Sequence, residues 1–518
     1  MKKKLSFALA LIVTLVSCQS IKAQTYNYVP DSTFDGNGLQ SFIFFNNIDR
    51  MYGCDLQTDE KVIMAGLSKN SNTGSFELCI VRLNVDGSFD STFNGDGIAY
   101  ISMGNQNSIG GQTPKVKIAP NGKIVIANTG FGSGSQDLLL CMLDTNGVLD
   151  PTFNSTGTLF VDMLGTNTQP DIANALDIDA QGNIYAIGST RTAGSPLDND
   201  FAIVKVNQSG QLVNTFSGDG KLLFNPNNAA DFGRGIKVQS DGKIVFGGSS
   251  GSNMMIGRID STGTLDVTFN TVGHVTITFQ LSSDMGALDL DQNERIVVAG
   301  KLLTSNSNIA VARYKSNGLF DPNFGFNGKY VFNVGGFANN ITAMHIQPDN
   351  KILLGGFMND SNSISKFCIT RVDTAGSIDL TLGGLGFVRQ PVIVGNVDEE
   401  CNGMAVMSDG RVILTGTTVY GSAINEDVAV CRIKPVLVTS TQEINGQQMI
   451  SAYPNPFSDE IQIASKEKGS GSLVDLSGRI LQSFQLNAGL NSISTTTLPA
   501  GMYFIRFNEI GAIRMIKP

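Results

Sequence analysis

Few residues of this 518-residue chain combine in a way that could do chemistry. The chain contains two histidines, His274 and His345, and seven cysteines that lack the spacing of a metal site such as Cys-x-x-Cys. One pattern does recur, in which a basic residue is followed eight positions later by an aspartate. At that spacing the two side chains could form a salt bridge across a hairpin, or the basic residues could form a ring of ligand-binding arginines.

Most members of this pattern occupy equivalent places, and we call them the corner pairs. They are Arg82 with Asp90, Arg258 with Asp266, Arg313 with Asp321, Arg371 with Asp379, and Arg432 with an expected partner, Asp31, at the other end of the array. Two copies depart from the pattern, because Met142 replaces the basic residue and Lys205 faces Val213. A ligand-binding position should differ between copies, whereas this one recurs. The recurrence therefore favours a structural pair that fixes a hairpin to the turn after it.

The corner pairs belong to a segment of about 58 residues that occurs seven times. Each copy carries an Asp-x-Thr-Phe sequence or a variant of it, which we call the corner. The corners are Asp31–Phe34, Asp90–Phe93, Asp150–Phe153, Val213–Phe216, Asp266–Phe269, Asp321–Phe324 and Asp379–Leu382. Each copy also has four short apolar segments, separated by turns such as Asp86-Gly87 and Asp241-Gly242. Such turns suit tight hairpins, because glycine tolerates a positive φ.

Four antiparallel strands in each copy predict an all-β fold, a seven-bladed β-propeller with four-stranded blades. No apolar repeat of helical period is present. An open solenoid is the structural alternative, but its coils are usually shorter and need caps. The array begins with a corner and one strand and ends with three strands. We therefore expect the strand at Leu39–Phe45 to pair beside Val428–Ile433, so that the N-terminal strand closes the ring.

The N-terminus has the features of a secretory signal peptide over residues 1–23. Lys2–Lys4 precede an apolar run over residues 5–16, which is too short to anchor the chain in a membrane. Cleavage after Ala23 is one prediction, and lipidation of Cys18 in a lipobox-like context is the other. No other segment is apolar over the length of a membrane span, so we expect no transmembrane anchor in the mature chain.

Composition limits the remaining choices. Glycine is abundant at 58 residues, charged residues make up 16% and tryptophan is absent, which suits an all-β protein with many tight turns. The net charge is −9 and no basic face is visible, so nucleic acid is excluded as a partner. We expect residues 24–434 to form the propeller and residues 435–447 to form a linker. Residues 448–518 should form a small β-sandwich.

The C-terminal segment carries a specific set of motifs. They are Tyr453–Phe457, Asp475–Arg479, Leu498–Phe507 and the basic ending Arg514–Lys517. Together they closely resemble the type A C-terminal sorting domain of type IX secretion cargo. The resemblance implies that the type IX secretion machinery is a partner and that the protein is secreted or held at the outer cell surface. The residues expected to carry the sorting motif are Pro454, Asn455, Pro456, Gly501, Tyr503, Arg514 and Lys517.

The repeats in turn resemble the delta-60 repeat family, whose signature matches segments such as Gln239–Val245. That family is regarded as propeller-like, and the resemblance implies no defined ligand. The sequence itself predicts no catalytic residue, cofactor or metal site. We expect a non-enzymatic propeller that binds an unknown glycan or protein. A secreted polysaccharide hydrolase or lyase, with its site in the propeller funnel, is the alternative.

The cysteines have a structural interpretation. Four of them, Cys79, Cys141, Cys368 and Cys431, fall on one face of the third strand of a copy, where other copies have small apolar residues. We expect these four to be packed free thiols. Cys54 and Cys401 fall on blades that are neighbours in a closed ring, and a disulfide between them is an open alternative.

Overall fold

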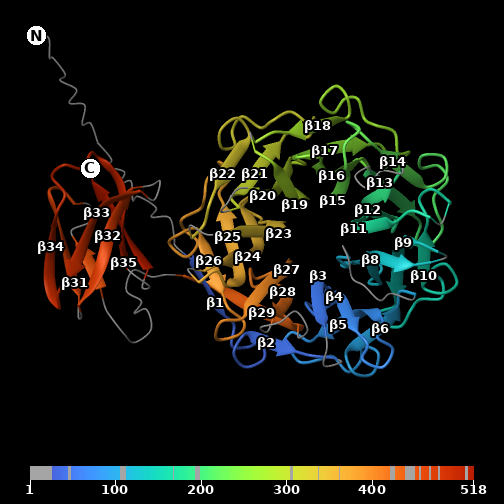
Figure 1. The fold of residues 1–518 in the computed structure, drawn as a ribbon, viewed down its shortest axis with the longest axis horizontal. Helices are drawn as coiled ribbons and strands as arrows, with labels where there is room; N and C mark the ends of the chain where they lie inside the picture. Colours follow the sequence, from blue (N-terminus) through green and yellow to red (C-terminus); the bar gives the residue numbers. More distant parts are fainter. Residues whose placement is uncertain are drawn as a thin grey trace, which may run out of the picture.

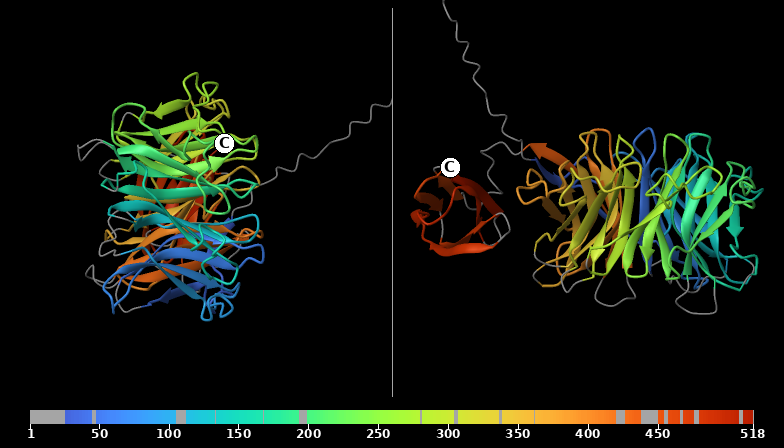
Figure 2. Two further views of the ribbon diagram at one scale, coloured as in Figure 1. Left: turned by 90° about the vertical axis from the view of Figure 1, so that its right-hand side faces the viewer. Right: turned by 90° about the horizontal axis from the view of Figure 1, so that it is seen from above.

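The computed structural model describes residues 26–44, 48–104, 112–132, 134–166, 168–192, 199–279, 281–303, 307–335, 338–360, 362–419, 426–437, 450–453, 457–465, 468–475, 479–507 and 511–517. Within these ranges every regular element is a β-strand. Seven sheets surround a common centre and form a seven-bladed β-propeller (Figure 1). Seen edge-on, the ring is a thick disc (Figure 2). The predicted fold class is confirmed.

The blades share one strand order, from the centre to the rim. The innermost strands are β3 (Asp49–Leu56), β7 (Lys115–Ile118), β11 (Asp171–Ile178), β15 (Asp231–Val238), β19 (Ser283–Leu290), β23 (Asn339–Ile346) and β27 (Asp398–Val406). The second strands are β4 (Val62–Lys69), β8 (Ile124–Phe131), β12 (Ile184–Arg191), β16 (Ile244–Ser250), β20 (Ile296–Leu302), β24 (Ile352–Asn359) and β28 (Val412–Val419). The third strands are β5 (Phe76–Leu83), β9 (Gln136–Leu143), β13 (Asn199–Val206), β17 (Asn253–Ile259), β21 (Ile309–Tyr314), β25 (Ser365–Val372) and β29 (Glu426–Leu437). The outer strands are β6 (Ile98–Ser102), β10 (Thr158–Val161), β14 (Lys221–Phe224), β18 (His274–Ile277), β22 (Lys329–Phe332), β26 (Phe387–Gln390) and β2 (Leu39–Phe42).

The seventh blade combines both ends of the repeat array. β2 pairs with β29, and the register places Leu39 opposite Cys431 and Phe42 opposite Val428. The pairing expected for the N-terminal strand is therefore present, and it covers the edge of β29 that would otherwise be free to pair with another chain. A further strand, β1 (Tyr26–Pro30), pairs with the end of β29. This pairing was not predicted, and it carries β29 to Leu437, beyond the expected end of the propeller at Lys434.

The core lies between the blades. Each of seven clusters of buried apolar side chains draws on two adjacent blades, because the two faces of one four-stranded sheet cannot both be buried without neighbours. The interface that closes the ring resembles the others: Ile413 and Val430 of the last blade pack with Val62 and Val81 of the first. Closing the ring therefore buries the last two exposed faces.

The corners connect neighbouring blades on the outside. In the first corner the side-chain oxygen of Asp31 accepts hydrogen bonds from Thr33, and the apolar ring of Phe34 is fully buried. The residue that follows, Asp35, donates its backbone N–H to the carbonyl of Asp86 in the next blade. A glycine ends the corner. Gly38 has φ +84°, and an added Cβ would lie 2.5 Å from the Asp31 nitrogen, so no other residue fits.

The C-terminal module consists of two antiparallel sheets. One contains β30 (Ile450–Tyr453), β31 (Glu460–Ser465) and β34 (Gly489–Ser494), and the other contains β33 (Ile480–Leu486), β32 (Gly469–Asp475), β35 (Gly501–Phe507) and β36 (Gly511–Lys517). Side chains of both sheets share one core, in which Ile461 and Ile493 of the first sheet join Leu473 and Ile505 of the second. The module thus has the sandwich architecture expected from its alternating strands.

Candidate functional site

The corner pairs form a buried network in the structure. Their ion-pair distances are 2.7 Å for Arg82–Asp90, 2.9 Å for Arg258–Asp266, 2.9 Å for Arg313–Asp321, 2.8 Å for Arg371–Asp379 and 2.8 Å for Arg432–Asp31. Only 3% of the Arg313 side chain and 1% of the Arg432 side chain are exposed. Charges this deeply buried need partners, and ion pairing supplies them here.

Within the described residues, four of the five arginines of this network, all except Arg371, also donate to a backbone carbonyl of the next blade. Arg313 donates to the carbonyl of Thr374, Arg82 to that of Thr145, and Arg432 to that of Val85. The guanidinium groups of Arg313 and Arg432 also lie over the rings of Phe324 and Phe34, respectively. The network therefore ties hairpin, corner and neighbouring blade together, which is a structural task.

A further basic residue, at the start of the second strand of a blade, also pairs with the corner aspartate, and the sequence analysis did not predict it. Six corner aspartates receive it, through Lys61–Asp90, Lys123–Asp150, Lys243–Asp266, Arg295–Asp321, Lys351–Asp379 and Arg411–Asp31. The signal was present in the sequence, because a basic residue follows the turn of the first hairpin in the same copies. In the third blade, where Val213 replaces the corner aspartate, Asn183 takes this place. The third blade thus lacks both the corner aspartate and the basic residue that would pair with it.

The corner carboxylates are strongly stabilised as anions. Burial acts to raise the pKa of Asp31, but hydrogen bonds from Thr33 and the charges of Lys434 and Arg432 outweigh it and lower that pKa to about 2. The pKa of Asp266 is also lowered to about 2, against the effect of burial, by Thr268, Arg258 and Lys243. These shifts identify the corner as an element that stabilises the fold above acidic pH.

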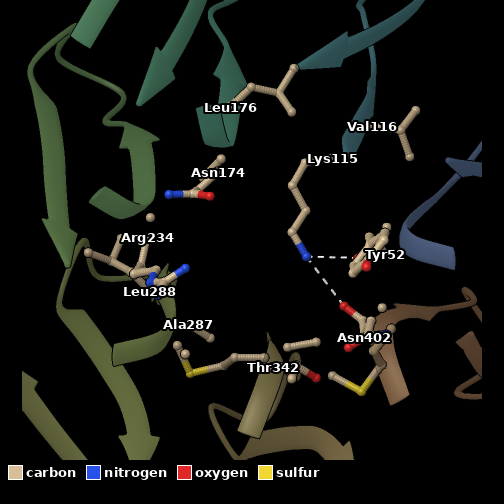
Figure 3. A pocket seen from close by; sticks show the side chains of 18 of the residues that line it. Tyr52, Lys115, Val116, Asn174, Leu176, Arg234, Ala287, Leu288, Thr342 and Asn402 are labelled. Carbon is tan, nitrogen blue, oxygen red and sulfur yellow. Dashed lines mark hydrogen bonds between the residues drawn. The ribbon is translucent and has the colours of Figure 1, made fainter. Parts of the chain in front are cut away.

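The centre of the ring holds a cavity of about 180 Å³, lined by all seven innermost strands (Figure 3). At one equivalent position of these strands, six of the seven blades have a glycine or an alanine. These residues are Gly53, Ala175, Gly235, Ala287, Ala343 and Gly403. The second blade has Lys115 at this position. A small residue at the axis lets the strands approach one another closely, so the long side chain of Lys115 extends into the space that the others leave.

Lys115 crosses the cavity toward two other blades (Figure 3). Its Nζ donates to the backbone oxygens of Tyr52 at 2.8 Å and Asn402 at 3.3 Å. Burial, together with the positive charge of Arg234, lowers the pKa of Lys115 to about 8. Sequence reasoning missed this residue, although a lysine in a position otherwise held by glycine and alanine was a visible exception.

β-Bulges direct a second set of side chains into the same cavity. The register of the first hairpin shifts between Gly233 and Gly235 in β15, and equivalent shifts occur in other blades. The bulged residues are Tyr52, Asn174, Arg234, Gly286, Thr342 and Asn402. They differ from blade to blade, whereas the corner residues repeat. The cavity therefore has the variability expected of a binding site.

Two residues further along the innermost strands, toward the first hairpin of each blade, the side chains at the equivalent position are mostly charged. The residues at this position are Asp55, Lys117, Asp177, Lys237, Asp289, His345 and Ala405. Lys237 pairs with Asp289 at 2.8 Å. Burial acts to lower the pKa of Lys237, but Asp289 and Asp177 outweigh it and raise that pKa. Burial lowers the pKa of His345, so this histidine is neutral near pH 7.

The two histidines lie where the strand pattern put them, His274 in an outer strand and His345 in an innermost strand. His274 packs its ring against Phe224 at 5.5 Å between centroids. In the described part of the chain, no group of three or more His, Cys, Asp or Glu is placed to hold a metal ion. The described part of the chain also contains no helix that is long and apolar enough to cross a membrane.

The cysteines of the propeller are free thiols. Cys79, Cys141, Cys368 and Cys431 are buried in third strands, as the strand pattern predicts. Cys54 and Cys401 are also free, so the structure contains no disulfide between these neighbouring blades. Burial raises the pKa of Cys141, Cys368 and Cys401 to about 12, which leaves these thiols without the reactive thiolate form near neutral pH.

Four of the residues expected to carry the sorting motif fall in two strands of the C-terminal module. Gly501 and Lys517 are opposite each other in β35 and β36, and the Lys517 Nζ donates to the carbonyl of Thr495 at 2.7 Å. Tyr503 is buried, and its hydroxyl donates to the carbonyl of Pro499 at 2.6 Å. Arg514 is in β36. Pro454–Pro456 lie outside the described residues, and so do Cys18 and the leader at residues 1–23.

Two family models match the chain. The model of the secretion system C-terminal sorting domain matches residues 451–517. The model described as a domain of unknown function (DUF5122) beta-propeller matches residues 57–93, 119–153, 239–269, 293–324 and 347–382. Both resemblances seen in the sequence are thereby confirmed.

No curated protein sequence matches the chain. Similar solved structures include a streptogramin B lyase, with 12% identity over 77% of this chain and 97% of that chain at a TM-score of 0.43. Polysaccharide lyase Uly1 has 12% identity over 74% of this chain and 89% of that chain, at a TM-score of 0.44. The beta-propeller domain of the Trilobed protease from Pyrococcus furiosus has 12% identity over 78% of this chain and 100% of that chain, at a TM-score of 0.40. Similarity at this level carries no argument about what the chain does.

Proposed function

Because the chain carries DUF5122 beta-propeller repeats and a secretion system C-terminal sorting domain, we propose that it is a secreted or cell-surface binding protein. The type IX machinery would export it through the C-terminal module. The central cavity would bind a glycan or a protein ligand without catalysing a reaction. The observation that carries the binding role is the contrast between side chains that repeat at the corners and side chains that vary around the cavity.

Export is supported by the match of the sorting-domain model over nearly the whole C-terminal module. The module has its own core and its own two sheets, so removing it leaves the propeller core intact. We expect that deleting residues 448–518 abolishes appearance at the cell surface and in the medium, measured by immunoblotting of fractionated cells. The control is the single change Lys315→Met in an exposed propeller hairpin, which should be exported normally. Surface export of the truncated chain would contradict the proposal.

The binding role is supported by the way the cavity is built. All innermost strands contribute, and the bulged positions carry an aromatic, an amide, a guanidinium or a hydroxyl group depending on the blade. Sites of this kind, concave and with a few convergent polar groups, are the usual locations of small-ligand binding. On a rigid ring, such variation costs little stability and supplies specificity.

The absence of catalysis is supported by the chemistry of the lining. Among the described residues that line the cavity, none is Asp, Glu or His. Glycoside hydrolysis normally needs two facing carboxyl groups. Screening the full chain on a glycan array, followed by incubation with each polysaccharide that is retained, tests both parts of the proposal. We expect retention with no new chain ends, whereas released products would make the protein an enzyme.

A lyase acting on a polyuronate is the second candidate, and one observation favours it. With a pKa lowered to about 8, Lys115 could act as a base on a proton next to a carboxylate near neutral pH. Against this, its Nζ already donates to two backbone oxygens. An increase in ultraviolet absorbance on incubation with polyuronate, lost in Lys115→Met, would establish this activity. No increase with polyuronates that bind would exclude it.

A further inference from the structure

The cavity at the centre of this acidic protein is lined by cations. Four of the lining residues are basic, Lys115, Lys117, Arg234 and Lys237, and none of the described lining residues is acidic. The whole chain carries a net charge of −9. A cavity with one sign of charge and walls of low dielectric concentrates the electric field and attracts ions of the opposite sign. Lys117 and Lys237 share a register with Asp55, Asp177 and Asp289, so the charge that suits the cavity to an anion is that of Lys115 and Arg234.

Lys115 has donor capacity left over. A lysine ammonium has three N–H donors, and two of them have acceptors, the backbone oxygens of Tyr52 and Asn402. Its Nζ has no carboxylate partner among the described residues, and its side chain is half-buried, so solvent reaches it. Carbonyl dipoles orient the ammonium but leave its charge unbalanced. The third donor is thus available for an anionic ligand.

Arg234 is the second unpaired cation. It occupies the bulge of β15, and within the described residues it forms no hydrogen bond and no ion pair, while its Nε is buried. This contrasts with Lys237 on the same strand, which pairs with Asp289. In the next blade the equivalent bulge residue is Gly286, where an added Cβ would lie 1.9 Å from the oxygen of Ile341. The backbone of the following blade therefore excludes a side chain from this position.

Three uncharged polar groups of the lining donate to backbone oxygens. Asn174 donates to the oxygen of Gly233 at 3.0 Å, Asn402 to that of Met51 at 3.2 Å, and the Thr342 hydroxyl to that of Cys401 at 2.7 Å. They hold neighbouring blades in register. Lys115 and Arg234 differ from them in having charge without a counter-charge. Figure 3 shows both side chains directed into the same space from different blades.

We propose that Lys115 and Arg234 together bind a single oxyanion, a carboxylate or a sulfate group, at the centre of the propeller channel. Arginine and lysine bind such groups through charge-assisted hydrogen bonds. The cavity of about 180 Å³ is far larger than the ~10–15 Å³ that one water needs. It therefore has room for the oxyanion together with the adjoining part of the ligand. The inference rests on the proposed binding function and assigns its ligand class. The oxyanion comes from an acidic sugar unit or is a free inorganic ion.

The test uses the full chain and three probes at matched ionic strength: glucuronate, inorganic sulfate and neutral glucose. Calorimetric titration should show saturable binding of glucuronate or sulfate and none of glucose. Lys115→Met and Arg234→Met should each weaken binding by about tenfold or more, the loss typical of one hydrogen bond to a charged group. Lys315→Met, which removes an equal charge from an exposed hairpin, should leave the affinity unchanged. Tighter binding of glucuronate identifies an acidic sugar, and tighter binding of sulfate identifies a free oxyanion.

A pH series separates the two cations. The titratable groups that act on Lys115 are Cys54 on β3, Arg234 on β15 and Cys401 on β27. Arg234 stays charged over the accessible range, and burial raises the pKa of both thiols well above 8. Anion binding should therefore weaken as the pH rises above 8 in the unchanged chain and in Arg234→Met, but not in Lys115→Met.

Two results would overturn the inference. One is the absence of saturable oxyanion binding while a neutral glycan from the array does bind, which would leave the proposed binding function standing. The other is unaltered oxyanion affinity in both Lys115→Met and Arg234→Met, which would place the anion elsewhere. If the array and the titrations show no ligand at all, the proposed function fails together with this inference.

Discussion

The corners and the central cavity are built from the same repeat, yet they treat charge in opposite ways. At the corners each aspartate has between one and three cations within ion-pair distance, and every arginine of the corner pairs is paired and buried. In the cavity Lys115 and Arg234 are cationic and lack an acidic partner among the described residues. Balanced charge that repeats around the ring stabilises the fold, whereas the charges of Lys115 and Arg234 occur in one blade each and have no counter-charge among the described residues. The difference distinguishes the scaffold from the proposed binding site within a single repeat.

The largest expected effect is on the corner that closes the ring. Arg432→Met would leave Asp31 buried without its main partner and would remove the bond to Val85 of the next blade. We expect a loss of about 3 kcal/mol in the free energy of unfolding, as for other buried pairs that lose one partner. Urea unfolding measures it, with the exposed Lys315→Met as control, within about 0.5 kcal/mol of the unchanged chain. A loss below about 1 kcal/mol would remove the structural interpretation of the corner pairs.

Acid should weaken the corners as a group. Asp31 and Asp266 have folded-state pKa values of about 2, below the ordinary value, so they contribute stability above about pH 4. That contribution is lost as the pH falls from about 4 to 2, because protonation removes the ion pairs. Asp171 has the opposite sign: burial raises its pKa to about 6, so its contribution improves as the pH falls from about 6 to 4. Thermal unfolding across pH 2 to 7 should show the fall below pH 4, and a flat profile there would contradict it.

Replacing Lys115 should have a small effect on stability, and unlike the change at Arg432 it should not destabilise the fold. Because burial lowers the pKa of Lys115 to about 8, the folded state is disfavoured while this lysine is charged, and the penalty decreases as the pH rises from about 8 to 10.5. Lys115→Met should therefore melt at pH 7 at the same or a higher temperature than the unchanged chain. A clear fall in the melting temperature would make Lys115 part of the scaffold rather than the site.

The smallest effect concerns the thiols, which belong to the scaffold side of the comparison. Burial raises the pKa of Cys141, Cys368 and Cys401 to about 12, so these groups should not react with a thiol reagent at pH 8 in the folded protein. Colorimetric labelling should count them only after unfolding in guanidinium. Rapid labelling of the folded chain would show that the blade interfaces open readily.

Local patterns predicted the corners well. The spacing from Arg313 to Asp321 and the turn Asn317-Gly318 specify a hairpin that returns the two side chains to each other, so their contact follows from a few residues. The pairing of Leu39–Phe42 with β29 was predictable as well, because an incomplete first copy and an incomplete last copy complement one another. The additional strand β1 was not, since Tyr26–Pro30 has no counterpart in the repeat.

The amino-acid sequence by itself determined the blade, the number of blades, the closure of the ring and the export module, because each depends on periodic spacing and on short motifs. Only the tertiary structure decided which side chains meet at the centre. Lys115 and Arg234 are more than a hundred residues apart, and no local rule relates them. They share a cavity because radial packing brings all innermost strands to one axis, where β-bulges and small residues determine which side chains enter it.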